Sequence, residues 1–384
     1  MDDGTTGTIM EHFGALEDPR IERAKRHALV DIITIALCAV ICGADTWVEV
    51  EEVGKAKQAW FATFLALPNG IPSHDTFGRV CAALDGGQVA TCFRGWVAAI
   101  AARTGTTGQV IAVDGKTVRR SHDRGAGKGA LHLVSAWACA NRLVLAQVPV
   151  TATSNEITAL PVILRMLALK GCIVTIDAMG CQTEVAQTIR AGEGDYVRAL
   201  KKNQGRLHGD VEGLFAEALA APDGGLAHDT HRAVDGGHRR ILIRQAWVIT
   251  DAATLRYLDP DGRWPDLRCV GMVQAERRVG TAVSHETRSY ISSLAASART
   301  LNDAVRSHWG IENKVHWVLD IAFREDESRA RTGHSAHNMA ILRHIALNLL
   351  RQETTARCGI KARRLKAGWD LPYLLKVRHG SDIW

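Results

Sequence analysis

The sequence lacks several patterns that would identify common classes of protein. Its nine cysteines include no C-x-x-C pair, and His334 and His337 form a lone close pair of histidines. This spacing argues against a structural zinc site and against a disulfide framework, so we expect a reducing compartment. The chain has no G-x-G-x-x-G, Walker A or G-x-S-x-G motif either, which argues against a metabolic α/β enzyme.

A membrane-spanning segment and a signal peptide are also missing. The most apolar run, 29-LVDIITIALCAVICG-43, has 15 residues and contains Asp31. It is too short to cross a bilayer, so we predict a buried helix. Met1 is followed by two aspartates and not by a basic segment, so we expect a cytoplasmic protein that is not bound to a membrane.

The charge is mildly positive and unevenly distributed. The 47 Lys and Arg exceed the 41 Asp and Glu, and residues 351–384 hold eight basic residues against three acids. This balance is compatible with a nucleic-acid partner but does not prove one. Lys361, Arg363 and Arg364 are candidate DNA contacts in that tail, and the alternative is a solvated helix face.

The patterning divides the chain into four regions of a mixed α/β protein. We predict a helical N-terminal domain over 1–105, and a first part of a strand-containing core over 106–224. A β-rich insertion covers 225–297, and the C-terminal helices of the core with a basic tail cover 298–384. The strand-rich parts and the helices together favour a layered sheet with helices packed on it.

The N-terminal region could bind DNA through a helix-turn-helix. An amphipathic stretch over 46–67 is followed by Pro68-Asn69-Gly70 and by a second predicted helix over 71–84 that carries Arg79. Such a pair could read DNA. An ordinary helical bundle explains the same pattern, and the sequence leaves both open.

Two aspartates follow apolar strands in the first part of the core. QVIAV stops at Asp114, and CIVTI stops at Asp177, with Gly115 and Gly180 close behind. Carboxylates at the ends of neighbouring strands could hold Mg²⁺, or each could cap its own turn. Between them we predict a hairpin over 131–150 and a helix that starts at a capping box of Thr153 and Glu156 and runs to about Leu169.

A third acid is expected on the helix predicted over 309–329. Ile311, Val315, Val318 and Ala322 form its apolar stripe, and Glu312 lies beside them. His316 and Asp320 follow Glu312 at i+4 and i+8. Glu312 could be a surface charge or an inward-facing ligand, while residues 325–327 are more typical of a solvated or arginine-paired cluster.

Long blocks of the sequence resemble the ISAs1 family of bacterial transposases, a group that contains the H-repeat-associated proteins and belongs to the IS4-like DDE transposases. The blocks are IPSHDTFGRV, VIAVDGKTVRRS, LHLVSAWACANRLVLAQ, SNEITALPVIL, GCIVTIDAMGCQ, GDYVRALKKNQ, RSHWGIENKVHWVLDIAFREDESRAR and GIKARRLKAGWDLPYLL. The resemblance implies an RNase H-like core with a DDE triad of Asp114 in VDGKT, Asp177 in TIDAMG and Glu312 in HWGIEN.

The same resemblance implies cofactors and partners. It implies two Mg²⁺ ions per site, with Mn²⁺ as a substitute, held by Asp114, Asp177 and Glu312. The substrate would be double-stranded DNA, both the element ends and the target, cut and joined by a homodimer at the nucleoid. The same site could serve a nuclease without strand transfer, and a decayed copy could bind DNA without cutting it.

One departure from the family pattern concerns cations near the third acid. IS4-like enzymes tend to carry Tyr, Arg, Glu and Lys with two, three and six residues between them, whereas Val305, His308 and Leu319 occupy the Tyr, Arg and Lys positions here. We therefore expect other cations to contact DNA phosphates. The candidates are Lys116, Arg119 and Arg120 after Asp114, Lys201 and Lys202 at a strand end, and Arg306.

Overall fold

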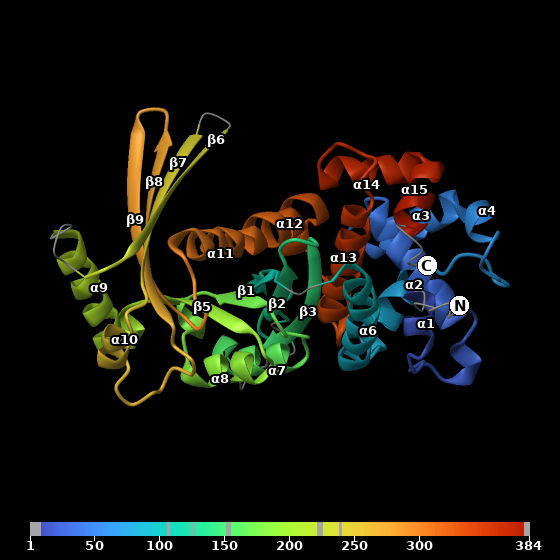
Figure 1. Cartoon of the computed structure of the whole chain (residues 1–384). Coiled ribbons are helices and arrows are strands. Elements are labelled where there is room, and N and C mark those ends of the chain that lie inside the picture. Colours follow the sequence, from blue (N-terminus) through green and yellow to red (C-terminus); the bar gives the residue numbers. More distant parts are fainter. Residues whose placement is uncertain are drawn as a thin grey trace, which may run out of the picture.

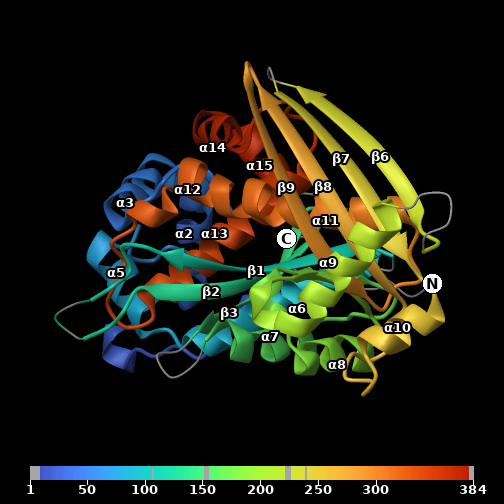
Figure 2. The same cartoon turned by 90° about the vertical axis from the view of Figure 1, so that its left-hand side faces the viewer.

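The computed structural model describes residues 9–105, 108–123, 125, 127–150, 155–220, 226–237 and 240–379. A large twisted sheet occupies one part of the molecule, and a helical region formed by both ends of the chain occupies the other (Figure 1). A long helical segment crosses above the sheet between these parts, which Figure 2 shows from a second direction.

The sheet has nine strands in the order β3-β2-β1-β4-β5-β9-β8-β7-β6. The strands are β1 (Val110–Val118), β2 (Leu131–Ala138), β3 (Leu143–Val150), β4 (Ile173–Ile176), β5 (Asp195–Leu200), β6 (Asp229–Gly237), β7 (Arg240–Ile249), β8 (Cys269–Val279) and β9 (Ala282–Ser292). The first three strands form an antiparallel meander, and β4 and β5 run parallel to β1. This order is that of an RNase H-like core, so the predicted fold class is confirmed.

The β-rich segment predicted over 225–297 extends the core sheet. Its last strand, β9, pairs antiparallel with β5, from Val197 opposite Ser292 to Leu200 opposite Ser289. The distal ends of β6 to β9 project away from the core as an arm (Figure 1). Hydrogen bonds therefore run without interruption from the core strands into the arm.

Helices cover the sheet and build the second region. They are α1 (Ile9–Gly14), α2 (Leu29–Ile41), α3 (Trp47–Ala56), α4 (Gln58–Phe61), α5 (His74–Ala83), α6 (Gly86–Thr104), α7 (Glu156–Arg165), α8 (Thr183–Ala191), α9 (Gly205–Ala220), α10 (Ala252–Leu258), α11 (Ala298–Ile311), α12 (Trp317–Phe323), α13 (Ser335–Gln352), α14 (Ile360–Trp369) and α15 (Leu371–His379). Short 3₁₀ turns are η1 (Glu22–Ala24), η2 (Ala178–Gly180), η3 (Lys202–Gln204) and η5 (Glu325–Glu327), and η4 (Glu312–His316) is a π-helical turn.

The C-terminal helices pack against the N-terminal ones (Figure 1). Helix α13 is buried along almost its whole length, and the Asn348 side chain bonds both the N–H and the C=O of Val144 in β3, at 2.9 and 3.0 Å. A single apolar core extends from Ile9 through the sheet to Val377. The domain boundary at residue 105 stays a prediction, because apolar packing is continuous across it.

The run over 29–43 is the buried helix that we predicted, α2, with Asp31 only 3% exposed. Among the described residues, no helix is both long and apolar enough to cross a membrane.

Of the two alternatives left open for the N-terminal region, the helix-turn-helix does not fit the geometry. Residues 57–73, which include α4, separate α3 from α5, whereas that motif needs a turn of about three or four residues. The helical-bundle alternative fits the packing of these helices against α2 and α13.

The predicted capping box is also wrong. Thr153 lies outside the described residues, and α7 is capped by Asn155, whose side chain accepts from the Thr158 N–H at 3.0 Å. The Thr158 hydroxyl in turn accepts from the Asn155 N–H at 3.1 Å. The helix ends at Arg165 and not near Leu169. Glu156 is thereby free to pair with His132, at 2.5 Å.

Candidate active site

Asp114 and Asp177 lie level with one another on neighbouring parallel strands. The β1–β4 register ends with Val113 opposite Ile176, so the next position along is Asp114 within β1 and Asp177 directly after β4. Because side chains alternate between the two faces of a sheet, equivalent positions on paired strands face the same side. The expectation that β1 stops at Asp114 is wrong: β1 continues to Val118 against β2, and only the parallel neighbour β4 ends here.

Glu312 reaches the same site on the helical segment above the sheet. Ser297 caps the start of helix α11, since its hydroxyl accepts from the Thr300 N–H at 3.2 Å, and the helix packs on β1 and β4. The segment continues through η4 into α12, and Glu312 is the first residue of that π-helical turn. Such turns occur frequently at functional sites. The predicted apolar stripe is largely confirmed, since Ile311, Val315 and Ala322 are buried and Val318 is half-buried.

All three predicted catalytic carboxylates line one pocket of about 360 Å³. Cationic, imidazole and aromatic side chains join them. The polar and aromatic lining includes Asp114, Thr175, Asp177, Lys201, Arg288, Tyr290, His308, Trp309 and Glu312. The pocket therefore brings together the acids that the sequence places far apart.

Burial and charge alter the acidity of two of the acids. Burial raises the pKa of Asp114 to about 6, His316 and the Gly115 N–H oppose this, and Asp177 and Glu312 add to it. The hydrogen bond from His316 lowers the pKa of Glu312. The Asp177 carboxylate accepts from the Gly180 N–H at 3.4 Å. Nearby positive charge and hydrogen bonds therefore compensate only part of the cost of burying the ionised Asp114 carboxylate.

His316 lies between two of these acids. Its Nδ1 is 3.1 Å from Glu312 Oε2 and 3.5 Å from Asp114 Oδ2, and the side chain is almost fully buried. Asp114, Glu312 and His316 each offer one potential ligand atom, and these three atoms lie within 4.8 Å of one another. Asp177 lines the same pocket but is not part of this tighter group.

His308, which occupies the family's arginine position, is close to Asp177. Its Nδ1 is 3.1 Å from the Thr175 hydroxyl, and burial lowers its pKa to about 4. The imidazole is therefore neutral at pH 7 and does not supply the charge of the missing arginine. Lys201 and Arg288 do bring cationic side chains into the pocket.

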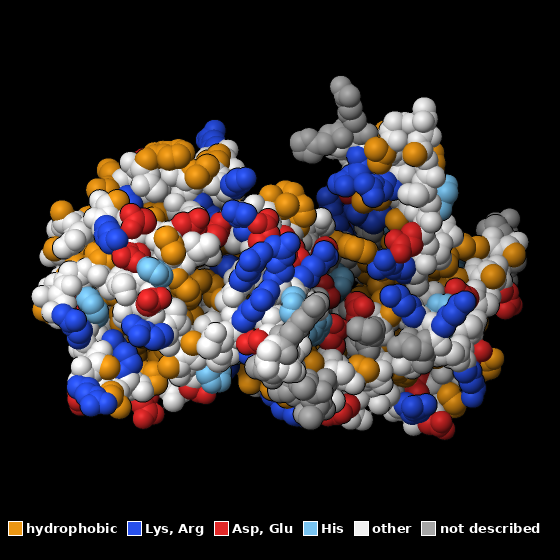
Figure 3. All heavy atoms as spheres, turned by 180° about the vertical axis from the view of Figure 1, so that it is seen from behind, with side chains coloured by type: hydrophobic (Ala, Val, Ile, Leu, Met, Phe, Trp, Pro, Cys, Tyr) orange, Lys and Arg blue, Asp and Glu red, His pale blue; other side chains and the backbone are white. Residues whose placement is uncertain are grey.

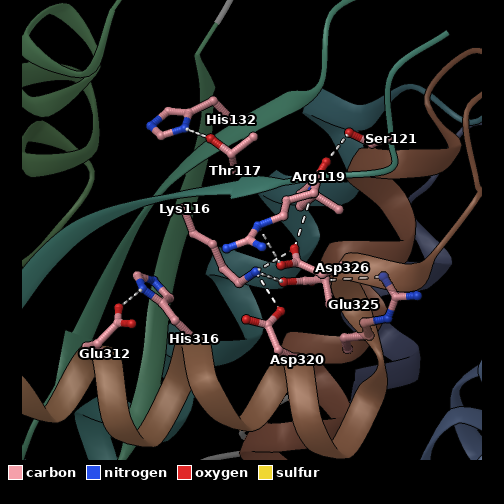
Figure 4. Close-up of polar contacts among 12 residues, drawn as sticks. Lys116, Thr117, Arg119, Ser121, His132, Glu312, His316, Asp320, Glu325 and Asp326 are labelled. Atoms are coloured by element: carbon pink, nitrogen blue, oxygen red, sulfur yellow. Dashed lines mark hydrogen bonds and ion pairs between the residues drawn. The ribbon is translucent and has the colours of Figure 1, made fainter.

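Lys116 and Arg364 do not present the free cations that the sequence suggested. Lys116 Nζ lies 2.7 Å from Asp320, 3.1 Å from Asp326 and 3.6 Å from Glu325 (Figure 4). Arg364 is 3% exposed and donates to the carbonyls of residues 40, 44 and 322 and to Asp45. These contacts argue against either side chain as a DNA contact.

Arg363 and Arg306 also have protein partners. Arg363 donates to the carbonyls of residues 350, 353, 356 and 358 around the end of α13. Arg306 is exposed on α11 and pairs with Asp235 of β6 at 2.7 Å. Arg363 therefore closes a loop, whereas Arg306 still presents part of its charge to solvent.

The remaining candidate cations lie at the surface. Arg119 pairs with Asp326 but has an 81% exposed side chain. Arg120, Lys201, Lys202 and Lys361 are exposed.

A second, larger groove of about 730 Å³ lies between the N-terminal helices and the segment after α12. Its lining includes five arginines, Arg79, Arg120, Arg324, Arg329 and Arg331. Figure 3 shows Lys and Arg side chains gathered across the middle of the back face of the molecule. Three acids, Asp45, Asp75 and Glu327, also line the groove, so its charge is mixed with an excess of arginines.

Sequence reasoning missed the pocket position of Arg288. Arg288 lies on β9, which pairs with β5 beside the acids, and its guanidinium is 4.7 Å from the centre of the Trp309 ring. Nothing in the alternating strand pattern indicates that β9 would join the core sheet. The sequence indicated that His316 lies near Glu312 only through their i+4 spacing.

Two family models together match most of the chain, up to residue 349. A model of the "DDE_Tnp_1-associated" family matches residues 10–97, and a model of the "Transposase DDE domain" family matches residues 105–349. The chain is 35% identical over 382 residues to the H repeat-associated putative transposase YhhI of Escherichia coli (strain K12), covering 98% of each chain.

Two further relatives and one solved structure are similar. The putative transposase YncI of Escherichia coli O157:H7 is 36% identical, with 96% of this chain and 94% of the relative covered. An uncharacterised protein in the dhlA 3′ region of Xanthobacter autotrophicus is 45% identical over 74% of this chain and 94% of its own length. The piggyBac transposase synaptic complex with hairpin DNA has a TM-score of 0.44 at 9% identity, covering 96% of this chain and 80% of that one.

Proposed function

Because the chain belongs to the family of transposases with a DDE domain, we propose that it cuts and joins DNA at Asp114, Asp177 and Glu312. The observation that carries this proposal is the shared pocket, in which carboxylates from β1, the end of β4 and the start of η4 meet. If these acids only capped their own turns, their side chains would not be expected to line the same pocket.

The donor set suits hard divalent cations. Carboxylate oxygens are the ligands that Mg²⁺ and Mn²⁺ prefer in proteins. Asp114, Asp177 and Glu312 would hold two Mg²⁺ ions per site, and Mn²⁺ would substitute for them. When bound, such a pair of ions activates the attacking water or 3′-hydroxyl and stabilises the leaving oxygen of an in-line displacement.

The neighbouring side chains would hold the DNA backbone at the acids. Lys201 and Arg288 line the pocket and can donate charge-assisted hydrogen bonds to the phosphates beside the reacting bond. Lys202 follows at the edge of the same turn, and Arg119 and Arg120 follow β1. Phosphoryl transfer of this kind needs no covalent enzyme intermediate, so no Ser or Tyr nucleophile is required.

The partners follow from the proposed reaction. The chain would bind double-stranded DNA, first at the terminal inverted repeats of its element and then at the target, in a homodimer that holds two ends. The arginine-lined groove between α3, α5 and the segment after α12 is the surface that we assign to duplex beyond the cut site. We place the chain in the ISAs1 group and at the bacterial nucleoid.

Cleavage and joining of labelled element-end DNA test this proposal. The wild type is expected to cut and join in Mg²⁺ and to stop in EDTA, and Glu312→Gln should lower the rate by about 10²–10³-fold or more. Asp303→Asn, an exposed acid on α11 outside the pocket, is the matched control and should keep normal activity.

The other outcomes separate the alternatives. Cleavage without joining would favour a nuclease. Binding of a verified end sequence without any metal-dependent cleavage would favour a decayed, DNA-binding copy. Full activity of Glu312→Gln would reject Glu312 as a ligand and direct attention to Asp320 or Glu325.

A further inference from the structure

Among the described residues, the hydrogen-bond and ion-pair partners of His316 are two carboxylates, those of Glu312 and Asp114. Figure 4 shows its ring turned toward the Glu312 carboxylate from the next turn of the same helical segment. The side chain is 4% exposed, and Nε2 has no hydrogen-bond partner among the described residues. The contacts of this ring that point to a ligand are therefore those of Nδ1, where the two carboxylates lie.

The spacing of the three groups matches donors around one ion. Ligands at 2.0–2.1 Å from an octahedral cation lie about 3 Å from their neighbours. The observed separations from His316 Nδ1 are 3.1 Å to Glu312 Oε2 and 3.5 Å to Asp114 Oδ2. A cation between them would therefore meet all three with small movements of the side chains.

The backbone supports the same assignment. Glu312 and His316 are the first and last residues of η4, the π-helical turn between α11 and α12. The apolar residues Ile311 and Val315, which precede each of them, are buried against the core. The turn is thus fixed by packing on one side while it presents a carboxylate and an imidazole on the other.

We infer that His316 Nδ1 is a direct ligand of the divalent cation shared by Asp114 and Glu312. The inference rests on the metal site of the proposed function, and it adds a nitrogen donor to the three carboxylates. Imidazole binds Mn²⁺ and Co²⁺ through a softer donor than carboxylate and favours such ions over Mg²⁺. The site would then discriminate between metals in a way that an all-oxygen triad does not.

Mn²⁺ bound to the full-length protein tests the inference without DNA. Electron spin-echo modulation should show ¹⁴N coupling in the wild type, changed to ¹⁵N coupling when the histidines are ¹⁵N-labelled. His316→Gln should lose this coupling and bind Co²⁺ at least about tenfold more weakly, with a smaller change for Mg²⁺. His308→Gln, which alters another imidazole of the same pocket, is the control and should keep the coupling.

The result that overturns the inference is Mn²⁺ bound to the wild type without nitrogen coupling. Coupling that survives in His316→Gln and disappears in His308→Gln would overturn it too, because it would assign the ligand to His308. If His316→Gln fails to fold, the isotope-labelled wild type together with His308→Gln still decides the question. Nitrogen-coupled Mn²⁺ in a protein that leaves DNA intact would reject the proposed function alone, and DNA cleavage without the coupling would reject this inference alone.

Discussion

Lys116 lies two residues from Asp114, yet its charge is used inside the protein. Its ammonium group joins Asp320 at the end of the helical segment to Glu325 and Asp326 in the following turn (Figure 4). Burial alone would lower the pKa of Lys116, but these carboxylates raise it above its usual value. Through these ion pairs, Lys116 links β1 to the helical segment that carries Glu312.

Replacing Lys116 by methionine should destabilise the fold strongly. Glu325 is 1% exposed, and it would lose its nearest cation while keeping Arg343 at 3.9 Å. Breaking a buried pair on one side costs about 3 kcal/mol. The measurement is the free energy of unfolding in urea. Arg119→Ala is the control: it breaks an ion pair to Asp326 at an 81% exposed side chain and should cost less than about 1 kcal/mol.

Equal losses for the two variants would contradict this assignment. If Lys116→Met were instead as stable as the wild type and bound DNA more weakly, the result would support the sequence-based prediction that Lys116 contacts a DNA phosphate.

At the scale of single elements, α11 determines where Glu312 lies. The helix rests on the sheet where Gly271 of β8 meets Leu301, and a Cβ at Gly271 would collide with Leu301 Cδ2 and lie 3.3 Å from the Trp247 carbonyl. The close approach of this helix to the strand depends on that missing side chain.

Gly271→Ala should therefore push α11 away from the sheet. We expect a loss of about 1–3 kcal/mol in the free energy of unfolding, as for other overpacked sites, together with a lower cleavage rate. Gly236→Ala on β6, where a Cβ would meet nothing within 4 Å, is the matched control and should be neutral. A Gly271→Ala protein as stable and active as the wild type would show that α11 is not held at this point.

The elements of the site differ in how far they could be predicted. Strands β1 and β4 are apolar runs that end at or pass an aspartate, so periodicity alone predicts two acids near one sheet edge. The two aspartates lie side by side because of the β1–β4 register, and that register depends on pairing between segments distant in the sequence. The partners of Lys116 lie 204 and 210 residues further along the chain, and no local pattern encodes them.

The third acid was chosen by resemblance and not by spacing. The apolar stripe of α11, η4 and α12 is visible in the sequence, but it leaves Glu312 and Asp320 as equal candidates on its edge. Tertiary packing separates them, because Glu312 lines the pocket while Asp320 binds Lys116. The π-helical turn has no sequence signal that we can identify.

At the scale of the whole molecule, buried histidines make stability depend on pH. Burial lowers the pKa of His344 to about 3 and that of His337 to about 4, from an ordinary value of 6.5. Both are neutral in the folded state at pH 5, whereas the unfolded chain binds protons there. Their contribution is present above pH 6.5 and is lost as the pH falls toward their folded-state values.

Unfolding by urea between pH 7 and pH 4.5 checks this dependence. Each histidine should contribute a slope of about 1.4 kcal/mol per pH unit below pH 6.5, so His344→Gln should reduce the total slope by that amount. His285→Gln, at an exposed position in the arm, is the control and should leave the slope unchanged. An unaltered slope in His344→Gln would contradict the burial of a neutral imidazole.

The arginine-lined groove predicts how DNA affinity depends on salt. Removing two phosphate contacts should reduce the slope of log affinity against log salt by about two. Arg79→Ala combined with Arg329→Ala tests this in a binding titration at several salt concentrations. Arg256→Ala combined with Arg263→Ala, both exposed and outside the groove, should leave the slope unchanged, and the same result for the first pair would exclude the groove as a duplex surface.

The order in which the acids occur along the chain has a consequence for protein synthesis. Asp114 and Asp177 leave the ribosome well before Glu312, with the strands of the arm between them. At translation rates of about 5–20 residues per second, the interval is roughly 7–27 s. Helix α13, which closes the core behind the site, comes later still. A nascent or prematurely terminated chain therefore lacks one of the three proposed metal ligands, and under the proposed function we expect it to be unable to cut DNA until synthesis is nearly finished.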